Sequence, residues 1–261
     1  MNKARIMANT TVKEAREGLK ECTTVIVPVG GVEQHGYHLP LSVDIHNGVE
    51  IAARASDLCG CFVAPPVTYS FSGGMLPGTI NVNPHVFSLV LIDICQSLVV
   101  QGFKNIVILL GHGGSENTRA ARDAAENFQR LRPDITGITL SVIPFWELSP
   151  TYLEKFEQGD YHAALCETSL MLYWKPELVK MEQACLDRAQ VLRRAAGDQD
   201  GYLKKETAAA GKYLIPKLTQ QPDIEVGVWG NYEGANAELG SKIATECARA
   251  LAEIVQTLEG R

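Results

Sequence analysis

The stretch Asn105-Ile-Val-Ile-Leu-Leu-Gly-His-Gly-Gly114 decides the fold expected of this chain. Residues 106–110 form an apolar run, which together with Asn105 has the length typical of a buried strand. The run ends in glycines around His112, which would therefore stand at the carboxyl edge of a parallel sheet, where open α/β sheets bind ligands. The plainer alternative is a tight strand-to-helix turn with an incidental histidine. A phosphate-binding P-loop is excluded, because no G-x-x-x-x-G-K-[ST] pattern follows the strand.

Outward from this stretch, short β-branched runs alternate with helical patterns, which predicts an α/β domain with a mostly parallel sheet. The other predicted strands are residues 23–29, 61–64 and 138–143. The predicted helices are residues 45–58, 85–101, 115–131, 162–175 and 235–258. Residues 65–84 are rich in Gly, Ser and Pro and are expected to form a wall of an active site. The order of elements favours a single domain over residues 1–261, while residues 182–222 could cover a pocket or contact a neighbouring subunit.

Composition narrows the class of protein. The chain has 261 residues, 46% of them hydrophobic and 21% charged, with a formal net charge of −6. This acidic balance and the absence of a dense Lys/Arg stripe argue against a nucleic-acid partner. No apolar run reaches the roughly 18 residues that span a bilayer, so no membrane partner is expected. The seven scattered cysteines and the lack of an apolar leader favour a cytoplasmic protein with reduced thiols.

The densest group of chemically active residues lies in the segment from Gly30 to Asp44. Glu33 and His35 are two positions apart, so a locally extended chain points both side chains the same way. Asp44 can return after a turn and offer a carboxylate to the same point. Mixed carboxylate and imidazole ligands suit Zn²⁺ or Mn²⁺, and a bridging carboxylate suits a two-metal centre. A polar loop whose histidines only bond to backbone is an equally weighted reading of this segment alone.

A further group lies in His162-Ala-Ala-Leu-Cys-Glu-Thr-Ser169. Glu167 stands in an apolar helical run, where a carboxylate is costly without a metal or a hydrogen-bond partner. His162 could act as a general acid or base. Taken alone, the segment is better explained as a helix start with a favourable acidic residue. Cys166 has no evident activating base, which argues against a cysteine hydrolase.

Taken together, these segments resemble the creatininase (creatinine amidohydrolase) family over nearly the whole chain. The motifs that carry the resemblance, in family order and spacing, are Glu33-Gln-His-Gly36, Leu39-Pro40, Asp44, Pro77-Gly-Thr79, Gly111-His-Gly-Gly114, Glu167-Thr-Ser169, Gly227-Val-Trp-Gly230 and Ala237 to Gly240. The resemblance implies a three-layer α/β/α fold and a homo-oligomer, often a hexamer. It also implies two divalent ions per subunit, Zn²⁺ and/or Mn²⁺, that activate water against a small-molecule substrate.

The resemblance also implies roles for individual residues. Asp44 would bridge the two ions; His35, His112 and Glu167 would bind one ion, and Glu33 would help bind the other. His162 matches the family's catalytic histidine. The residues expected to line the substrate pocket are Ser70, Gly113, Trp146 and Tyr161.

Two positions depart from the creatinine-cleaving members. Those members carry a carboxylate two positions after the strand-end histidine, where this chain has Gly114, and a histidine where it has Met75. Glu116 is the nearest candidate for a substitute metal ligand. The leading hypothesis is hydrolysis of a C–N bond in a cyclic amide, a formamide or a peptide-like link. The alternatives are C–C ring opening of an oxidised cyclitol such as 3-dehydro-scyllo-inosose, and a metal-binding subunit without activity.

Overall fold

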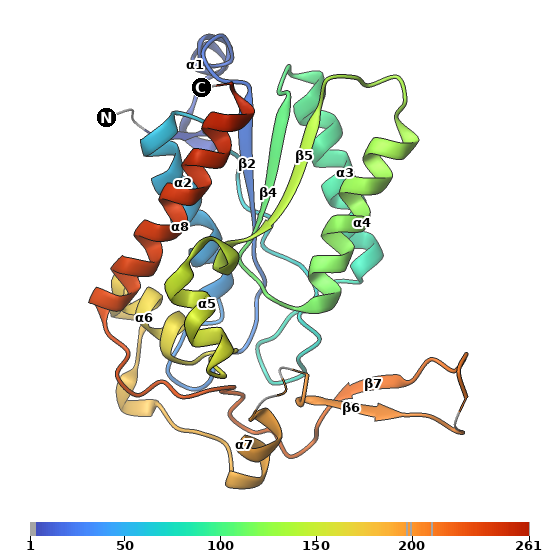
Figure 1. The fold of residues 1–261 in the computed structure, drawn as a ribbon, viewed down its shortest axis with the longest axis vertical. Coiled ribbons are helices and arrows are strands. Elements are labelled where there is room, and N and C mark those ends of the chain that lie inside the picture. Colours follow the sequence, from blue (N-terminus) through green and yellow to red (C-terminus); the bar gives the residue numbers. More distant parts are fainter. Residues whose placement is uncertain (1–3, 197, 199, 210, 261) are drawn as a thin grey trace.

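A five-stranded parallel sheet forms the centre of the computed structural model, which describes residues 4–196, 198, 200–209 and 211–260 (Figure 1). Across the sheet, the strands run in the order β1 (Arg5–Ile6), β3 (Phe62–Val63), β2 (Thr24–Val29), β4 (Asn105–Leu110) and β5 (Thr139–Pro144). Every neighbouring pair is parallel. The carboxyl ends of β2, β4 and β5 therefore meet at one edge of the sheet.

Helices cover both faces of the sheet, which confirms the three-layer α/β/α prediction (Figure 1). On one side lie α2 (Val43–Cys59), α6 (Leu165–Trp174) and α8 (Ala237–Leu258), and on the other lie α3 (Pro84–Val100) and α4 (Ser115–Leu131). The remaining elements are η1 (Met7–Asn9), α1 (Val12–Gly18), η2 (Phe145–Leu148), α5 (Pro150–Glu157), η3 (Pro176–Leu178), η4 (Met181–Gln183), α7 (Ala189–Ala195), β6 (Leu203–Glu206) and β7 (Lys217–Gln220).

The two central strands explain why the sheet is buried on both sides. All six residues of β2 and all six of β4 are buried, and they pair in register from Thr24 with Asn105 to Val29 with Leu110. Side chains alternate between faces, so Leu109 packs with α6 and α8 while Ile108 packs with α3 and α4. Each such fully buried side chain contributes about 1.5–3 kcal/mol to folding. The apolar runs therefore fix the sheet.

The helix predicted over residues 162–175 begins later, at Leu165. Ala163 has a positive φ of 51°, a backbone conformation that cannot continue into a helix. The carboxylate of Asp160 accepts a hydrogen bond from the backbone N–H of Cys166 at 2.8 Å and so satisfies a donor in the first turn. As a consequence, His162 lies in an extended segment outside the helix, and the predicted helix start was wrong by three residues.

Residues 182–222, expected either to cover a pocket or to contact a neighbouring subunit, contain α7 and an antiparallel hairpin of β6 and β7. The hairpin projects away from the three layers (Figure 1). Its outer end exposes Tyr213 and Ile215, with 86% and 90% of their surfaces accessible. Among the described residues, no helix is both long and apolar enough to span a membrane.

Candidate metal centre and pocket

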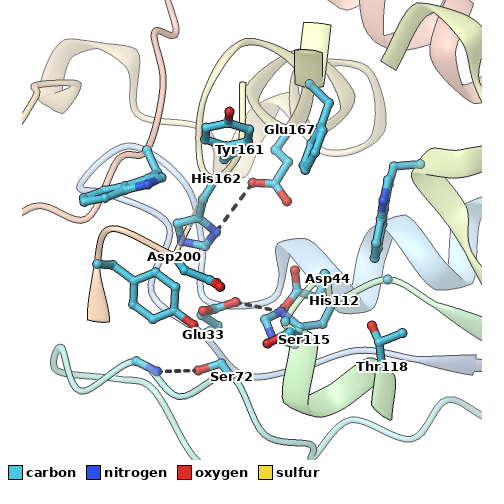
Figure 2. Close-up of a pocket in the computed structure, with 18 of the residues that line it drawn as sticks. Glu33, Asp44, Ser72, His112, Ser115, Thr118, Tyr161, His162, Glu167 and Asp200 are labelled. Carbon is cyan, nitrogen blue, oxygen red and sulfur yellow. Dashed lines mark hydrogen bonds and ion pairs between the residues drawn. The ribbon is translucent and has the colours of Figure 1, made fainter. Parts of the chain in front are cut away.

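Five polar side chains gather at the carboxyl edge of the sheet, and we call them the ligand cluster: Glu33, His35, Asp44, His112 and Glu167. They come from the loop after β2, the first turn of α2, the end of β4 and the first turn of α6. Their exposed fractions are all 7% or less. Three of them, Glu33, Asp44 and His112, face one another across the pocket floor in Figure 2.

Asp44 joins two groups of three potential ligand atoms. One group is Glu33, Asp44 and His112, and the other is His35, Asp44 and Glu167; within each group the atoms lie within 4.8 Å of one another. Asp44 Oδ2 is 3.2 Å from His112 Nδ1, while its Oδ1 is 3.3 Å from His35 Nε2. The carboxylate thus offers one oxygen to each group. The division differs from the expected one, because His112 stands with Glu33 and not with Glu167.

The geometry of these contacts fits a divalent cation. Glu33 Oε2 is 2.9 Å from His112 Nδ1, yet Glu33 Oε2, Asp44 Oδ2 and His35 Nε2 are buried and lack a partner in hydrogen-bonding geometry. Buried polar atoms without a partner are costly, and a metal ion would satisfy several at once. Oxygen and imidazole donors are those that Zn²⁺ and Mn²⁺ accept. The residues present therefore fit two cations that share Asp44.

The histidines and carboxylates of the ligand cluster strongly shift one another's pKa values. Burial is the largest single influence on His35 and opposes its protonation, but the carboxylates of Glu167 and Asp44 together raise its pKa well above the usual value. The pKa of His112 is raised in the same way against burial by Glu33 and Asp44. Burial alone would raise the pKa of Asp44, yet the two histidines lower it. The buried histidines and carboxylates thus favour one another's charged forms.

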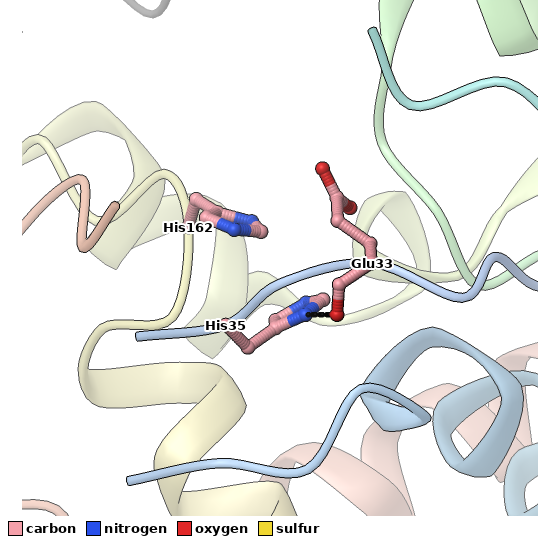
Figure 3. Close-up of side chains that lie close together, drawn as sticks. All are labelled: Glu33, His35 and His162. Atoms are coloured by element: carbon pink, nitrogen blue, oxygen red, sulfur yellow. Dashed lines mark hydrogen bonds between the residues drawn. The ribbon is translucent and has the colours of Figure 1, made fainter. Parts of the chain in front are cut away.

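Glycines let the sheet edge approach the start of α2. A Cβ atom at Gly111 would lie 2.1 Å from the backbone oxygen of Asp44, and one at Gly30 would lie 2.7 Å from the backbone of Ile45. Both positions thus require glycine for close packing. The ring of His35 is held by its Nδ1, which donates to the backbone oxygen of Glu33 at 3.1 Å (Figure 3). In the neutral ring this leaves the Nε2 lone pair facing the ligand cluster.

His162 stands beside the ligand cluster and is held by the C-terminal part of the chain. Its backbone pairs with Trp229 in both directions, at 3.0 and 2.8 Å. The ring lies 4.3 Å from that of His35, and its Nδ1 is 3.9 Å from Glu167 Oε2, the contact dashed in Figure 2. Its Nε2 lies 2.8 Å from the backbone oxygen of Gln34 and 3.1 Å from the Gln34 amide nitrogen. His162 also forms a group with Glu33 and His35 that could hold an ion.

A cavity of about 610 Å³ opens above the ligand cluster. Of the residues expected to line a pocket, Gly113, Trp146 and Tyr161 do so. Ser70 does not line it, because it is buried and its hydroxyl donates to the backbone oxygen of Gly30 at 2.9 Å. From residues 65–84, Ser72 and Gly74 reach the cavity.

Residues 200–209 and 211–224 also border the cavity, and we call them the rim segment. Its Asp200, Tyr202, Gln220 and Ile224 line the pocket. The amide oxygen of Gln220 accepts from the backbone N–H of Met75 at 2.7 Å, which ties the hairpin to the opposite wall. Covering the pocket is thus one role of this segment.

Glu116 stands apart from both groups of ligand atoms. Its Oε2 accepts from the hydroxyl of Ser115 at 2.9 Å, and it belongs to none of the three clusters able to hold an ion. Nor is there room for a side chain at Gly114, where a Cβ atom would lie 2.5 Å from His112 Nε2. Glu167, already implied as a ligand by the family resemblance, lies with His35 and Asp44 in the second group.

Two residues that support the site, Asp187 and Gln34, were not predicted from the sequence to do so. Asp187 accepts three backbone N–H bonds, from Glu225, Val226 and Gly227, at 2.7–3.0 Å. These bonds fix the turn at Gly227, whose φ is +79°. The Gly227-Val-Trp-Gly230 motif was a signal for this turn, but nothing in the sequence near Asp187 pointed to its partner. Gln34 lies inside a recognised motif, although its contact with His162 joins residues 128 positions apart.

Comparison with known proteins agrees with this geometry. The family model described as Creatininase, creatinine amidohydrolase, matches residues 8–255. This chain belongs to the creatininase family. It is accordingly a metal-dependent hydrolase of that family, with buried His, Glu and Asp groups as its candidate metal site.

Curated relatives of this family member act on different substrates. The chain is 30% identical over 184 residues to a 3-dehydro-scyllo-inosose hydrolase of Thermotoga maritima, covering 67% of this chain and 57% of that protein. It is 27% identical to a creatinine amidohydrolase of Pseudomonas putida, covering 70% and 76%. A mycofactocin precursor peptide peptidase of Mycolicibacterium smegmatis is 30% identical over 61% of each chain. The match thus spans less than two thirds of two of these proteins.

Solved structures share the whole fold. A crystal structure of creatinine amidohydrolase superposes with a TM-score of 0.77 at 21% identity, covering 98% of both chains. Two further creatininase structures, at 20% and 23% identity, are described as a manganese form and a Zn-Zn type. At these identities the likeness establishes the fold of this family member.

Proposed function

We propose that this creatininase-family chain hydrolyses a C–N bond, in an amide, a cyclic amide or a formamide, of a small polar substrate. The observation that carries the proposal is the pair of ligand groups that share Asp44 at the floor of the cavity. In the overall reaction, water adds to the carbonyl carbon, the C–N bond breaks, and the departing nitrogen takes up a proton.

The ligand cluster would hold two divalent ions, Zn²⁺ and/or Mn²⁺. Glu33, Asp44 and His112 would bind the first ion, and His35, Asp44 and Glu167 the second. Such a pair of ions lowers the pKa of water and polarises a carbonyl group.

The protein's own side chains orient and protonate the substrate. His162 is half-buried at the edge of the ligand cluster, where its ring can move a proton between the pocket and the departing nitrogen. The Trp229 backbone bridge keeps the ring at this place. The Trp146 ring lies against Gly113, 3.4 Å from a Cβ built there, and forms an apolar wall that excludes water from one side of the substrate.

Ring opening of an oxidised cyclitol is the second candidate. Its support is the 30% identity to a 3-dehydro-scyllo-inosose hydrolase together with glycine at position 114 and methionine at 75. The same residues would then serve the hydrolytic cleavage of a C–C bond next to a ring ketone.

A substrate panel on metal-loaded protein tests both candidates. The protein is stripped with a chelator, reloaded with Zn²⁺ or Mn²⁺, and assayed with creatinine, formamides, acylated dipeptides and oxidised inositols. Amide turnover that fails in Glu33→Gln and His162→Ala but persists in Glu116→Gln supports the proposal, since Glu116 lies outside the ligand cluster. Turnover of inosose derivatives alone would favour the second candidate. Equal turnover by all variants contradicts both.

We further propose that the chain works in the cytoplasm as a homo-oligomer, with a hexamer as the expected size from the family resemblance. The scattered and mostly buried cysteines support a reducing compartment. Light scattering of the purified protein measures the number of subunits, and a monomer at micromolar concentration would contradict the assembly.

A further inference from the structure

The cavity extends from the ligand cluster along one face of α4. The face consists of Ser115, Thr118, Arg119, Arg122, Asp123 and Glu126, all of which line the cavity. These positions recur every three to four residues, as expected of one helix face. The opposite face, with Ala121, Ala124 and Phe128, is buried against the sheet. The helix thus presents a polar wall that leads away from the reaction site.

This wall is long in relation to a small cyclic amide. From residue 115 to 126 a helix rises about 16 Å, at roughly 1.5 Å per residue. The volume of about 610 Å³ is likewise in the range of cavities that hold drug-sized ligands. An elongated substrate would fill the wall while its scissile bond lies at the ligand cluster.

Two guanidinium groups on this wall have no carboxylate partner. Arg119 and Arg122 are exposed and three residues apart, which places them side by side on the helix. In the part of the chain that the structure describes, neither forms an ion pair, whereas Arg130 on the same helix lies 3.7 Å from Glu126. Glu126 is therefore already partnered.

Among the described residues that line the cavity, Arg119 and Arg122 are the only arginine or lysine side chains. The acidic residues there are Asp123 next to Arg122, Glu126 with its Arg130 partner, Asp200 on the rim segment, and Glu33, Asp44 and Glu167 of the ligand cluster. Apart from metal ions held by the ligand cluster, the permanently charged partners of an anionic substrate end among the described lining residues are Arg119 and Arg122, whereas a cationic end would meet carboxylates at many places.

We propose that Arg119 and Arg122 bind a carboxylate of an elongated, peptide-like substrate whose scissile amide lies at the ligand cluster. This inference rests on the proposed amide hydrolysis and names its substrate class. Guanidinium groups suit the task because each can donate two parallel hydrogen bonds to one carboxylate. The arginines would act on substrate binding and specificity, and the ligand cluster and His162 would act on bond cleavage.

The first test compares matched substrates on zinc-loaded protein. N-acetylated dipeptides with a free C-terminal carboxylate are compared with the same peptides as C-terminal carboxamides. We expect kcat/KM to favour the free acid by about ten-fold, the combined effect of two exposed charge-assisted contacts. In the Arg119→Gln/Arg122→Gln double variant the preference for the free acid over the carboxamide should disappear through a higher KM for the free acid. Arg130→Gln, on the same helix but outside the cavity lining, is the matched control and should retain the preference.

A binding measurement separates failure of this inference from failure of the proposed function. Glutarate and the neutral glutaramide are titrated by calorimetry into zinc-loaded wild type, the double variant and Arg130→Gln. Weaker glutarate binding in the double variant alone supports the arginine site even if no peptide is cleaved, in which case the proposed amide hydrolysis fails separately. Equal glutarate affinity in all three proteins, or cleavage with equal preference in all three, overturns the inference. Thermal melts of each variant ensure that only folded proteins are compared.

Discussion

The ligand cluster and the rim segment border the same cavity but are built in opposite ways. The ligand cluster is buried, and its residues follow strands and helix starts whose positions the apolar pattern dictates. The rim segment places its pocket residues at or beside the base of a hairpin, whose strands have only four residues each and are largely exposed beyond that base. A substitution in the buried ligand cluster disturbs several contacts at once. A substitution in the exposed part of the hairpin changes the free energy of unfolding little. We therefore expect substitutions in the ligand cluster to have larger effects than substitutions in the rim segment.

Asp44→Asn should have the largest effect, because this residue contributes an oxygen to both ligand groups. We expect metal affinity to fall by more than about 100-fold, beyond the range seen when only a supporting residue is lost. Activity should fall with it. Metal content after dialysis, measured by mass spectrometry, checks the result. Asp123→Asn, an exposed carboxylate on the same cavity, is the control, and equal metal loss in both variants would contradict the assignment.

His162→Gln should separate proton transfer from metal binding. We expect kcat to fall by about 10²–10⁴-fold, the usual contribution of a positioned acid or base. The two ions should remain, since both ligand groups are complete without His162. Steady-state kinetics and metal analysis of the same preparation provide the check. If the variant loses one equivalent of metal, His162 is a ligand and not the proton carrier.

Gly114→Ala should weaken metal binding, because the added methyl group crowds the ring of His112. The added Cβ would lie 2.5 Å from His112 Nε2, so the ring must shift, which disturbs the contacts of its Nδ1 with Glu33 and Asp44. We expect metal affinity to fall by roughly 10–100-fold, as for the loss of an orienting neighbour. Gly113→Ala makes only an ordinary 3.4 Å contact with Trp146 and is the control. Competition with a zinc-binding dye compares the two, and unchanged affinity at position 114 would show that the ring adapts.

The pH dependence of stability should reverse when metal binds. In the metal-free protein, the raised pKa values of His35 and His112 mean that these groups stabilise the fold below their unfolded pKa near 6.5. That contribution is lost as pH rises through the higher folded pKa values. Metal binding needs neutral imidazoles, so metal-loaded protein should gain stability over the same rise. Urea unfolding with and without Zn²⁺ between pH 6 and 9 tests this, and parallel curves would count against the cluster as a metal site.

Ile215→Ser at the outer end of the hairpin should have the smallest effect. This side chain is 90% exposed, and such substitutions change the free energy of unfolding by about 0.5 kcal/mol or less. If each subunit is active by itself, its activity should stay unchanged. Urea unfolding, kinetics and light scattering are measured together, and a loss of assembly would give the hairpin a role between subunits.

The difference between the ligand cluster and the rim segment also explains which features could be predicted from the sequence. The strand over residues 105–110 was predicted with the bounds that the structure has, because a long apolar run leaves few alternatives. The local spacing of Glu33, His35 and Asp44 predicted that they lie near one another, but Glu33 and His35 stand in different ligand groups that share Asp44. The helix start at Leu165 was missed, since it depends on the left-handed Ala163 and on Asp160, whose effects are visible only in three dimensions.

Other features of the site rest on contacts between distant residues. Gly114 had raised the question of a missing carboxylate, and Glu116 was the nearest substitute along the chain. In the structure Glu116 lies outside the ligand cluster, while Glu167, which the family resemblance already implied as a ligand, lies in one group with His35 and Asp44. The hairpin was missed for a similar reason, because β6 and β7 are short and polar and carry little apolar alternation.

The backbone bridge between His162 and Trp229 has a consequence for synthesis of the protein. All five members of the ligand cluster lie before residue 168, but Trp229, whose backbone holds His162, is made 62 residues after Glu167. A nascent chain on the ribosome can thus expose all its proposed metal ligands well before the backbone of His162 is fixed. At about 5–20 residues per second, this leaves several seconds in which the growing polypeptide can take up metal ions without acting on its substrate.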